Sequence, residues 1–180
     1  MDLKTLKVAN SLSLIQYTRL QEVWKHAFHY KQLDLGSQLG FTDAMIQKKE
    51  NVDIICQCII NQKKLQICYF FDSKLNGVSG LKIVFAMTRL TTLTQINLGL
   101  NKTWFKSEEF IENLCLTISR QIGLKELYLG FGNHLSSCKS LKILQVVGAS
   151  PTLQTITSLS LSHCNWDEQA NCEELANLIA

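Results

Sequence analysis

Two hydrophobic periodicities alternate along the chain. In residues 93–98, 124–129 and 156–161, the fourth and sixth positions are apolar and a polar side chain stands between them. This alternation is typical of a strand with one buried face. In residues 107–122, apolar side chains instead recur at three- and four-residue steps, which is typical of an amphipathic helix. Ser107, which two glutamates follow, is a favourable N-terminus for that helix.

Similar helical spacing occurs in three other segments, residues 14–28, 43–62 and 80–89. Strand and helix patterns therefore alternate about six times along the chain. Consecutive strands that are joined through helices are expected to be parallel. The sequence thus predicts an α/β fold with a parallel sheet.

The strand segments belong to an internal repeat. Residues 93–101 (LTQINLGLN), 124–132 (LKELYLGFG) and 156–166 (ITSLSLSHCNW) share leucine or isoleucine at the first, fourth and sixth positions. Because 28 of the 180 residues are leucine, a single match would be unremarkable. Six copies at spacings of 27 to 35 residues, close to the repeat length of a solenoid or slightly above it, are not expected by chance. With three weaker copies included, the repeats begin at residues 3, 30, 65, 93, 124 and 156.

These copies follow the pattern L-x-x-L-x-L-x-x-(N/C)-x-L, and the chain resembles the leucine-rich repeat family, in particular its ribonuclease-inhibitor-like class. The resemblance implies one domain over residues 1–180, a horseshoe-shaped solenoid of about six repeats with a parallel sheet on the concave face and helices on the convex side. It also implies that the ninth residue of each copy points inward and bonds backbone groups of the turn. Only two ninth residues have the preferred type, so we expect irregular turns; the six residues are Ser11, Gln38, Ser73, Asn101, Gly132 and Cys164.

A doubly wound nucleotide-binding fold shares the alternation of strand and helix and is the main structural alternative. Its strands are covered on both faces and read as continuous apolar runs, whereas the strands here are apolar on one side only. No glycine-rich phosphate-binding motif follows any of them. The solenoid is the favoured interpretation.

The third, fifth and seventh residues of each copy are expected to face away from the helices. In the middle copies these positions are aromatic and apolar, and toward both ends they are polar, a distribution typical of a protein-contact surface. The alternative is that tyrosine simply favours strands and needs no partner. The predicted protein-binding residues are Ile67, Tyr69, Phe71, Asn97, Tyr128 and Phe131.

No terminal caps are evident, because the first copy begins at Leu3 and the last helical pattern, residues 173–179, runs nearly to the end. Solenoids need caps with a polar outer face. Either the chain is a piece of a longer one, or another subunit covers an open end and its unpaired strand edge. We expect this chain to belong to a larger assembly.

Composition narrows the function classes further. With 46% hydrophobic residues, 18% charged residues and a formal charge of +3, disorder and a nucleic-acid-binding function are not favoured. The seven cysteines have no disulfide-framework spacing, and no secretory signal precedes them, so they indicate reduced thiols in the cytoplasm. Polar residues interrupt the uncharged stretch 143–166, so no membrane span is predicted.

The sequence singles out no catalytic residue, metal site, cofactor or small-molecule substrate. The cluster of His163, Cys164 and Cys172 is not favoured as a metal site, because Cys164 already occupies an inward ninth position. We therefore predict a non-catalytic protein–protein interaction module that serves as a structural or scaffolding subunit. A recognition fragment of a signalling or ubiquitin-ligase receptor is an alternative; an enzyme or an RNA-binding protein is another, from a different class.

Overall fold

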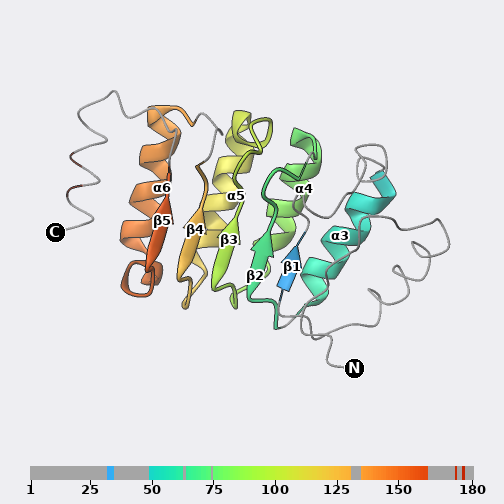
Figure 1. The fold of residues 1–180 in the computed structure, drawn as a ribbon, viewed down its shortest axis with the longest axis horizontal. Coiled ribbons are helices and arrows are strands. Elements are labelled where there is room, and N and C mark those ends of the chain that lie inside the picture. The colour runs from blue at the N-terminus through green and yellow to red at the C-terminus, as the bar shows by residue number, and fades with distance from the viewer. Residues whose placement is uncertain are drawn as a thin grey trace.

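The computed structural model of the chain describes residues 32–34, 49–62, 64–73, 75–130, 135–161, 173 and 176. All five strands of this described part lie in one parallel sheet, and each strand pairs with the next one along the chain (Figure 1). The strands are β1 (Gln32–Asp34), β2 (Ile67–Tyr69), β3 (Gln95–Asn97), β4 (Glu126–Tyr128) and β5 (Ser158–Ser160).

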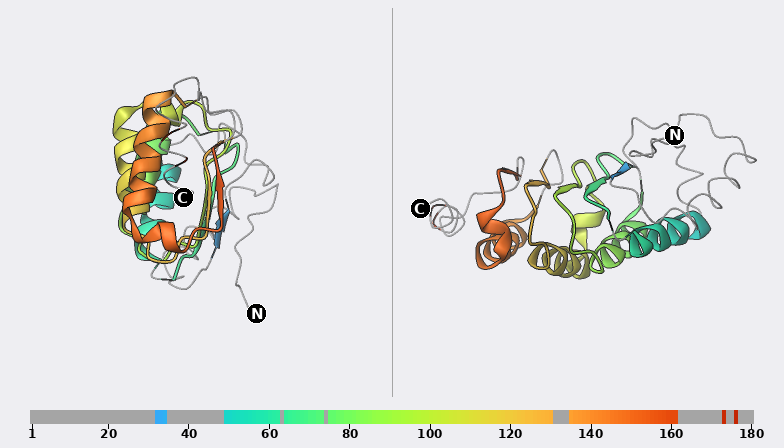
Figure 2. Two further views of the ribbon diagram at one scale, coloured as in Figure 1. Left: turned by 90° about the vertical axis from the view of Figure 1, so that its left-hand side faces the viewer. Right: turned by 90° about the horizontal axis from the view of Figure 1, so that it is seen from below.

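The described helices form a second layer that covers one face of the sheet (Figure 2). Adjacent helices pack on one another in chain order. This arrangement confirms the predicted α/β class and parallel sheet, and it excludes the doubly wound alternative for the described residues, because that fold has helices on both faces. The helices are α3 (Lys49–Asn61), α4 (Gly77–Met87), α5 (Glu108–Ser119) and α6 (Ser137–Ala149), with the 3-10 turns η2 (Trp104–Lys106) and η3 (Pro151–Gln154).

The structure differs from the sequence-based expectation in the number of repeats. Five strands are described where six repeats were expected, so six are not supported; the copy that begins at residue 3 lies outside the described residues, as does the helix expected at 14–28. The helices expected at 43–62, 80–89 and 107–122 correspond to α3, α4 and α5. Helix α6 was not placed from the sequence.

The apolar repeat positions form the core between the two layers. The alternation along each strand sends one set of side chains toward the helices, where they lose contact with water. Full burial of an aliphatic side chain of this size contributes about 1.5–3 kcal/mol. Nine residues at the first, fourth and sixth positions are completely buried: Leu65, Cys68, Phe70, Leu93, Ile96, Leu98, Leu124, Leu127 and Leu129.

Large aromatic side chains fill the space above the ends of β2 and β3. The indole of Trp104 is fully buried, with ring centroids 5.9 Å from Phe70 and 5.8 Å from Phe110. Its Nε1 donates a hydrogen bond to the carbonyl oxygen of Leu75 at 2.9 Å. On α4, Gly80 lies so close to this indole that a Cβ there would overlap it. Glycine at this position therefore lets the helix approach the aromatic cluster.

The chain turns sharply after β2 and β3 at equivalent repeat positions. Asp72 has φ 51° and Leu100 has φ 59°, both in the left-handed region that L-residues seldom adopt. Each is the eighth residue of its copy, and the ninth residues that follow, Ser73 and Asn101, are buried. The two turns thus share a left-handed residue at the same repeat position although their sequences differ.

Asn101 ties these two turns together. Its Oδ1 accepts hydrogen bonds from the backbone N–H of Ser73 at 3.3 Å and from the Ser73 hydroxyl at 2.9 Å. Its Nδ2 donates to the carbonyl oxygens of Phe70, Leu98 and Gly99 at 2.5, 3.1 and 3.1 Å. The side chain therefore points inward and bonds backbone groups, as the sequence predicted.

A second buried amide hydrogen-bonds backbone groups at the other end of the strands. Gln121, which has no exposed surface, accepts a hydrogen bond from the backbone N–H of Leu93 at 2.9 Å. Its Nε2 donates to the carbonyl oxygens of Leu90 and Thr117, each at 2.8 Å. At both ends of the strands, side-chain amides thus form hydrogen bonds with backbone groups of a neighbouring repeat.

We expect Asn101→Ala to lower the free energy of unfolding by about 3 kcal/mol, because it leaves several buried backbone groups unpaired. Asn113→Ala is the matched control, since the Asn113 amide is exposed and bonds only its own helix, at the carbonyl oxygen of Glu109. The control should change stability by less than about 0.5 kcal/mol. Equal effects of the two substitutions in urea denaturation would contradict the role assigned to Asn101.

Candidate functional site

Five of the six predicted binding residues lie on the open face of the sheet, which no described helix covers (Figure 2). Strand β2 carries Ile67 and Tyr69, and Phe71 follows two residues later; strands β3 and β4 carry Asn97 and Tyr128. We call the surface formed by these five residues the aromatic patch. The sixth predicted residue, Phe131, lies outside the described residues.

Parallel pairing places the residues of the patch in one row across the strands. Tyr69 is in register with Asn97, and Asn97 is in register with Tyr128. Because neighbouring strands are about 4.8 Å apart, the two tyrosine backbones are separated by about 10 Å. Both tyrosines are partly exposed.

Asn97 contributes less exposed surface than its predicted role implies. Only 8% of it is exposed, and its Oδ1 accepts a hydrogen bond from the backbone N–H of Gly99 at 3.1 Å. This short local bond keeps the amide close to its own strand. At the centre of the patch, between Tyr69 and Tyr128, the Asn97 side chain therefore projects little above the sheet.

Phe71 extends the apolar surface toward the end of β3. A Cβ at Gly99 would lie 2.8 Å from Cδ2 of Phe71, so the ring packs directly over the glycine backbone. The ring centroids of Tyr69 and Phe71 are 6.2 Å apart with an interplanar angle of 38°, a distance typical of aromatic pairs. The two rings therefore lie side by side, and Gly99 is buried beneath Phe71.

Gly99 and Glu126 are the two features of this site that the sequence analysis did not single out. Both occupy outward positions of the repeat, and that periodicity is the signal that could have identified them. Glu126 lies on β4 two residues before Tyr128 and pairs in register with Gln95 and Ser158. It is half-buried, and it forms no ion pair with another described residue.

Burial makes four of the five described cysteine thiols poor nucleophiles. Loss of hydration raises the pKa of Cys58 to about 12 and, on α5, that of Cys115 to about 11. The same cause raises the pKa of Cys56 to about 11, with a smaller contribution from the charge of Asp53. For the completely buried Cys68 the pKa is also raised. At neutral pH these four thiols are protonated, and the thiol form does not attack electrophiles.

The described ranges also show neither a metal-binding cluster nor a membrane-spanning helix. Among those residues, no group of three or more histidine, cysteine, aspartate or glutamate side chains is placed to hold a metal ion. His163, Cys164 and Cys172 lie outside them. No helix in the described part of the chain is both long enough and apolar enough to cross a bilayer.

Comparison with known proteins identifies a fold but no family. No protein-family model matches the sequence, and no curated protein matches it either. The fold is similar to that of a solved structure titled "Leiomodin-1 Actin-Binding Site 2 (ABS2)", with a TM-score of 0.64 and 12% sequence identity over 94% of this chain and 89% of that chain. At this identity the likeness is one of fold alone.

We expect native labelling with iodoacetamide at mildly alkaline pH to modify Cys138 before the other described cysteines, because it is the exposed cysteine among them. Cys58, Cys68 and Cys115 are buried and should react at least about tenfold more slowly. Mass spectrometry of tryptic peptides measures the rates, and labelling in denaturant provides the control in which all of these thiols react. If Cys68 reacts as fast as Cys138 in the native protein, the assigned burial is wrong.

Proposed function

We propose that the chain is a leucine-rich repeat protein and that its strand–helix units form a horseshoe-shaped solenoid. The equivalent left-handed turns at Asp72 and Leu100 support this, since a repeat predicts the same backbone geometry at the same position. The inward-pointing amide of Asn101 supports it as well. The sequential strand order β1 to β5 agrees with a solenoid in which each repeat contacts its neighbours.

We propose further that the protein is a non-catalytic protein–protein interaction module that binds a protein through the aromatic patch. The observation that carries this proposal is the row Tyr69–Asn97–Tyr128, extended by Phe71, on a sheet face that no described helix covers. Tyrosine and phenylalanine are enriched in protein interfaces because they bury a large area and lose little conformational entropy. Strand propensity alone explains the residue types but not the close packing of Phe71 over Gly99.

The structural comparison favours the same class of function. The solved structure with a similar fold carries a title that names an actin-binding site of leiomodin, so this fold serves protein binding in that case. We do not propose actin as the partner of this chain, because proteins that share a fold bind different partners. We propose a partner protein within a larger assembly, in which the chain acts as a scaffolding subunit.

We also propose a cytoplasmic, reducing location. The described cysteines are free thiols, and most of them are buried among apolar residues. Free buried thiols are typical of proteins that do not meet an oxidising compartment. Their raised pKa values support a non-catalytic role as well.

The double variant Tyr69→Ala/Tyr128→Ala tests the proposed function, because it removes both rings of the row and leaves the core side chains intact. We expect partner proteins that crosslink to the wild-type chain in native extract to be lost at least about tenfold, as for substitution of central interface aromatics. Quantitative mass spectrometry of the crosslinked species measures this loss.

Phe85→Ala/Leu116→Ala is the matched control. It also removes two exposed apolar side chains, but from α4 and α5 in the helix layer, where 54% of Phe85 and 43% of Leu116 are exposed. The control should retain the same partners. Retention by both double variants, each folded by circular dichroism, would show that the aromatic patch is not the binding surface.

A further inference from the structure

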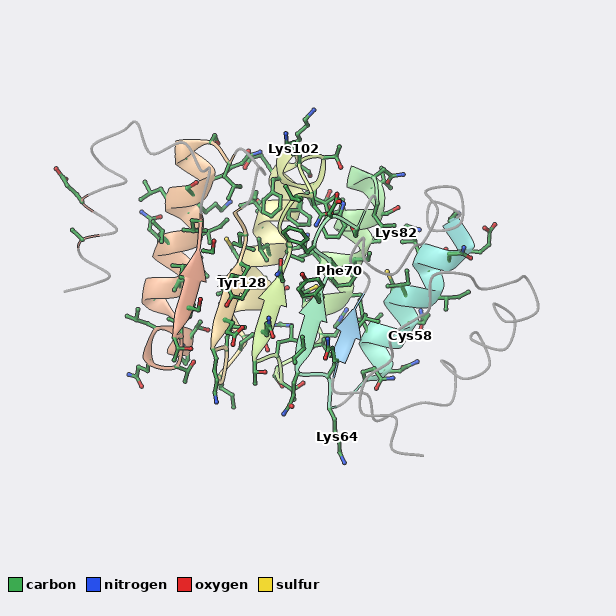
Figure 3. The ribbon with its side chains drawn as sticks, in the orientation of Figure 1. Cys58, Lys64, Phe70, Lys82, Lys102 and Tyr128 are labelled. Carbon is green, nitrogen blue, oxygen red and sulfur yellow. The ribbon has the colours of Figure 1, made fainter. Side chains whose placement is uncertain are left out.

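The open face of the sheet carries no cationic residue at its described positions, although the protein as a whole is basic. The chain has 18 lysines and arginines against 15 aspartates and glutamates. Three of the described lysines lie away from this face: in Figure 3, Lys64 and Lys102 project at opposite ends of the strands, and Lys82 belongs to α4. The twelve described positions on the face are Gln32, Ile67, Tyr69, Phe71, Gln95, Asn97, Gly99, Glu126, Tyr128, Gly130, Ser158 and Ser160.

At its described positions, the charge that this face carries is negative. Glu126 stands within the sheet between Gln95 and Ser158, and it has no cationic partner among the described residues. By contrast, three carboxylates of the helix layer are paired across neighbouring helices: Asp53 with Lys82 at 2.6 Å, Glu108 with Lys139 at 3.1 Å and Glu112 with Lys142 at 3.5 Å. A half-buried carboxylate without a partner is less strongly hydrated than a fully exposed one, so an incoming cation stabilises it more.

The tyrosine rings also favour a cationic group on the partner. The face of an aromatic ring carries a partial negative charge and attracts a guanidinium or ammonium group. Tyr128 is on the same strand and the same face as Glu126, two residues further along. A side chain seated there can contact the ring and the carboxylate together.

From this arrangement we infer that the aromatic patch binds a partner segment which presents an arginine or lysine side chain to Glu126 and Tyr128 and apolar side chains to Tyr69 and Phe71. The inference rests on the proposed function and specifies the chemistry of the partner. Arginine fits better than lysine, because its planar guanidinium stacks on a ring while it donates two parallel hydrogen bonds to a carboxylate. Acidic segments are disfavoured, since the patch offers them no cation.

Selection from an unbiased display library of short random peptides tests the inference. Peptides are retained if they bind the wild-type protein and not the Tyr69→Ala/Tyr128→Ala variant, so that only binders dependent on the patch remain. We expect these peptides to be enriched in arginine and lysine. Synthetic copies should bind about five- to tenfold more weakly to Glu126→Gln, the loss expected for a partly desolvated ion pair with a cation–π contact.

Two further variants sharpen the test. Glu109→Gln removes a carboxylate from the exposed first turn of α5 and should leave peptide binding unchanged, which controls for the overall charge of the protein. Glu126→Lys reverses the charge within the patch and should shift the selected peptides toward acidic sequences. Binding of the basic peptides should also weaken at high salt.

The outcomes separate the two proposals. If peptides that depend on the tyrosines show no enrichment in basic residues, or bind Glu126→Gln as tightly as the wild type, the inference is overturned while the proposed function stands. If no selected peptide depends on the tyrosines, the aromatic patch is not a protein-binding surface, and both proposals fail. Enrichment in basic residues together with weaker binding to Glu126→Gln supports both.

Discussion

The parallel register of consecutive strands is the constraint on which the candidate surface depends. Backbone hydrogen bonds connect each repeat to both neighbours, as from Thr94 N–H to the carbonyl of Gln66 in the preceding repeat and from Leu98 N–H to the carbonyl of Tyr128 in the following one. Since every side chain lies beside its counterpart in the next repeat, residues about thirty positions apart form one row. A shift of one residue would bury Tyr69 and Tyr128 and expose the core leucines.

Much of the layer arrangement could be predicted from the sequence, because strand and helix leave different hydrophobic periods. The alternation at Ile96 and Leu98 correctly predicted a buried side of β3, and the three- and four-residue steps after Ser107 predicted α5, whose N-cap is indeed Ser107. Helix α6 was missed because its first turn contains serines, and the apolar spacing becomes clear only from Leu141 onward. The horseshoe shape and the leucine-rich repeat assignment stay proposals.

The details of the site could not be read from the sequence, because they arise from contacts between residues in different repeats. No pattern in the sequence predicts that Phe71 packs on Gly99, twenty-eight positions later. Nor does any pattern predict that a hydrogen bond from the Gly99 N–H keeps the Asn97 amide close to its strand. Periodicity selects the face on which a side chain lies but not its height above that face. The unpaired state of Glu126 within the described part likewise depends on where the lysines of other elements lie.

The central claim is that the protein meets its partner through the open face of the sheet, and site-specific photo-crosslinking in cells that make the protein tests it most directly. A photoreactive amino acid at Gln95, in β3 between the neighbours Ile67 and Glu126, is compared with the same group at Glu109 in the helix layer. The account predicts a discrete protein adduct from position 95 and none from position 109. An adduct from position 109 alone would contradict it and place the binding surface on the helices.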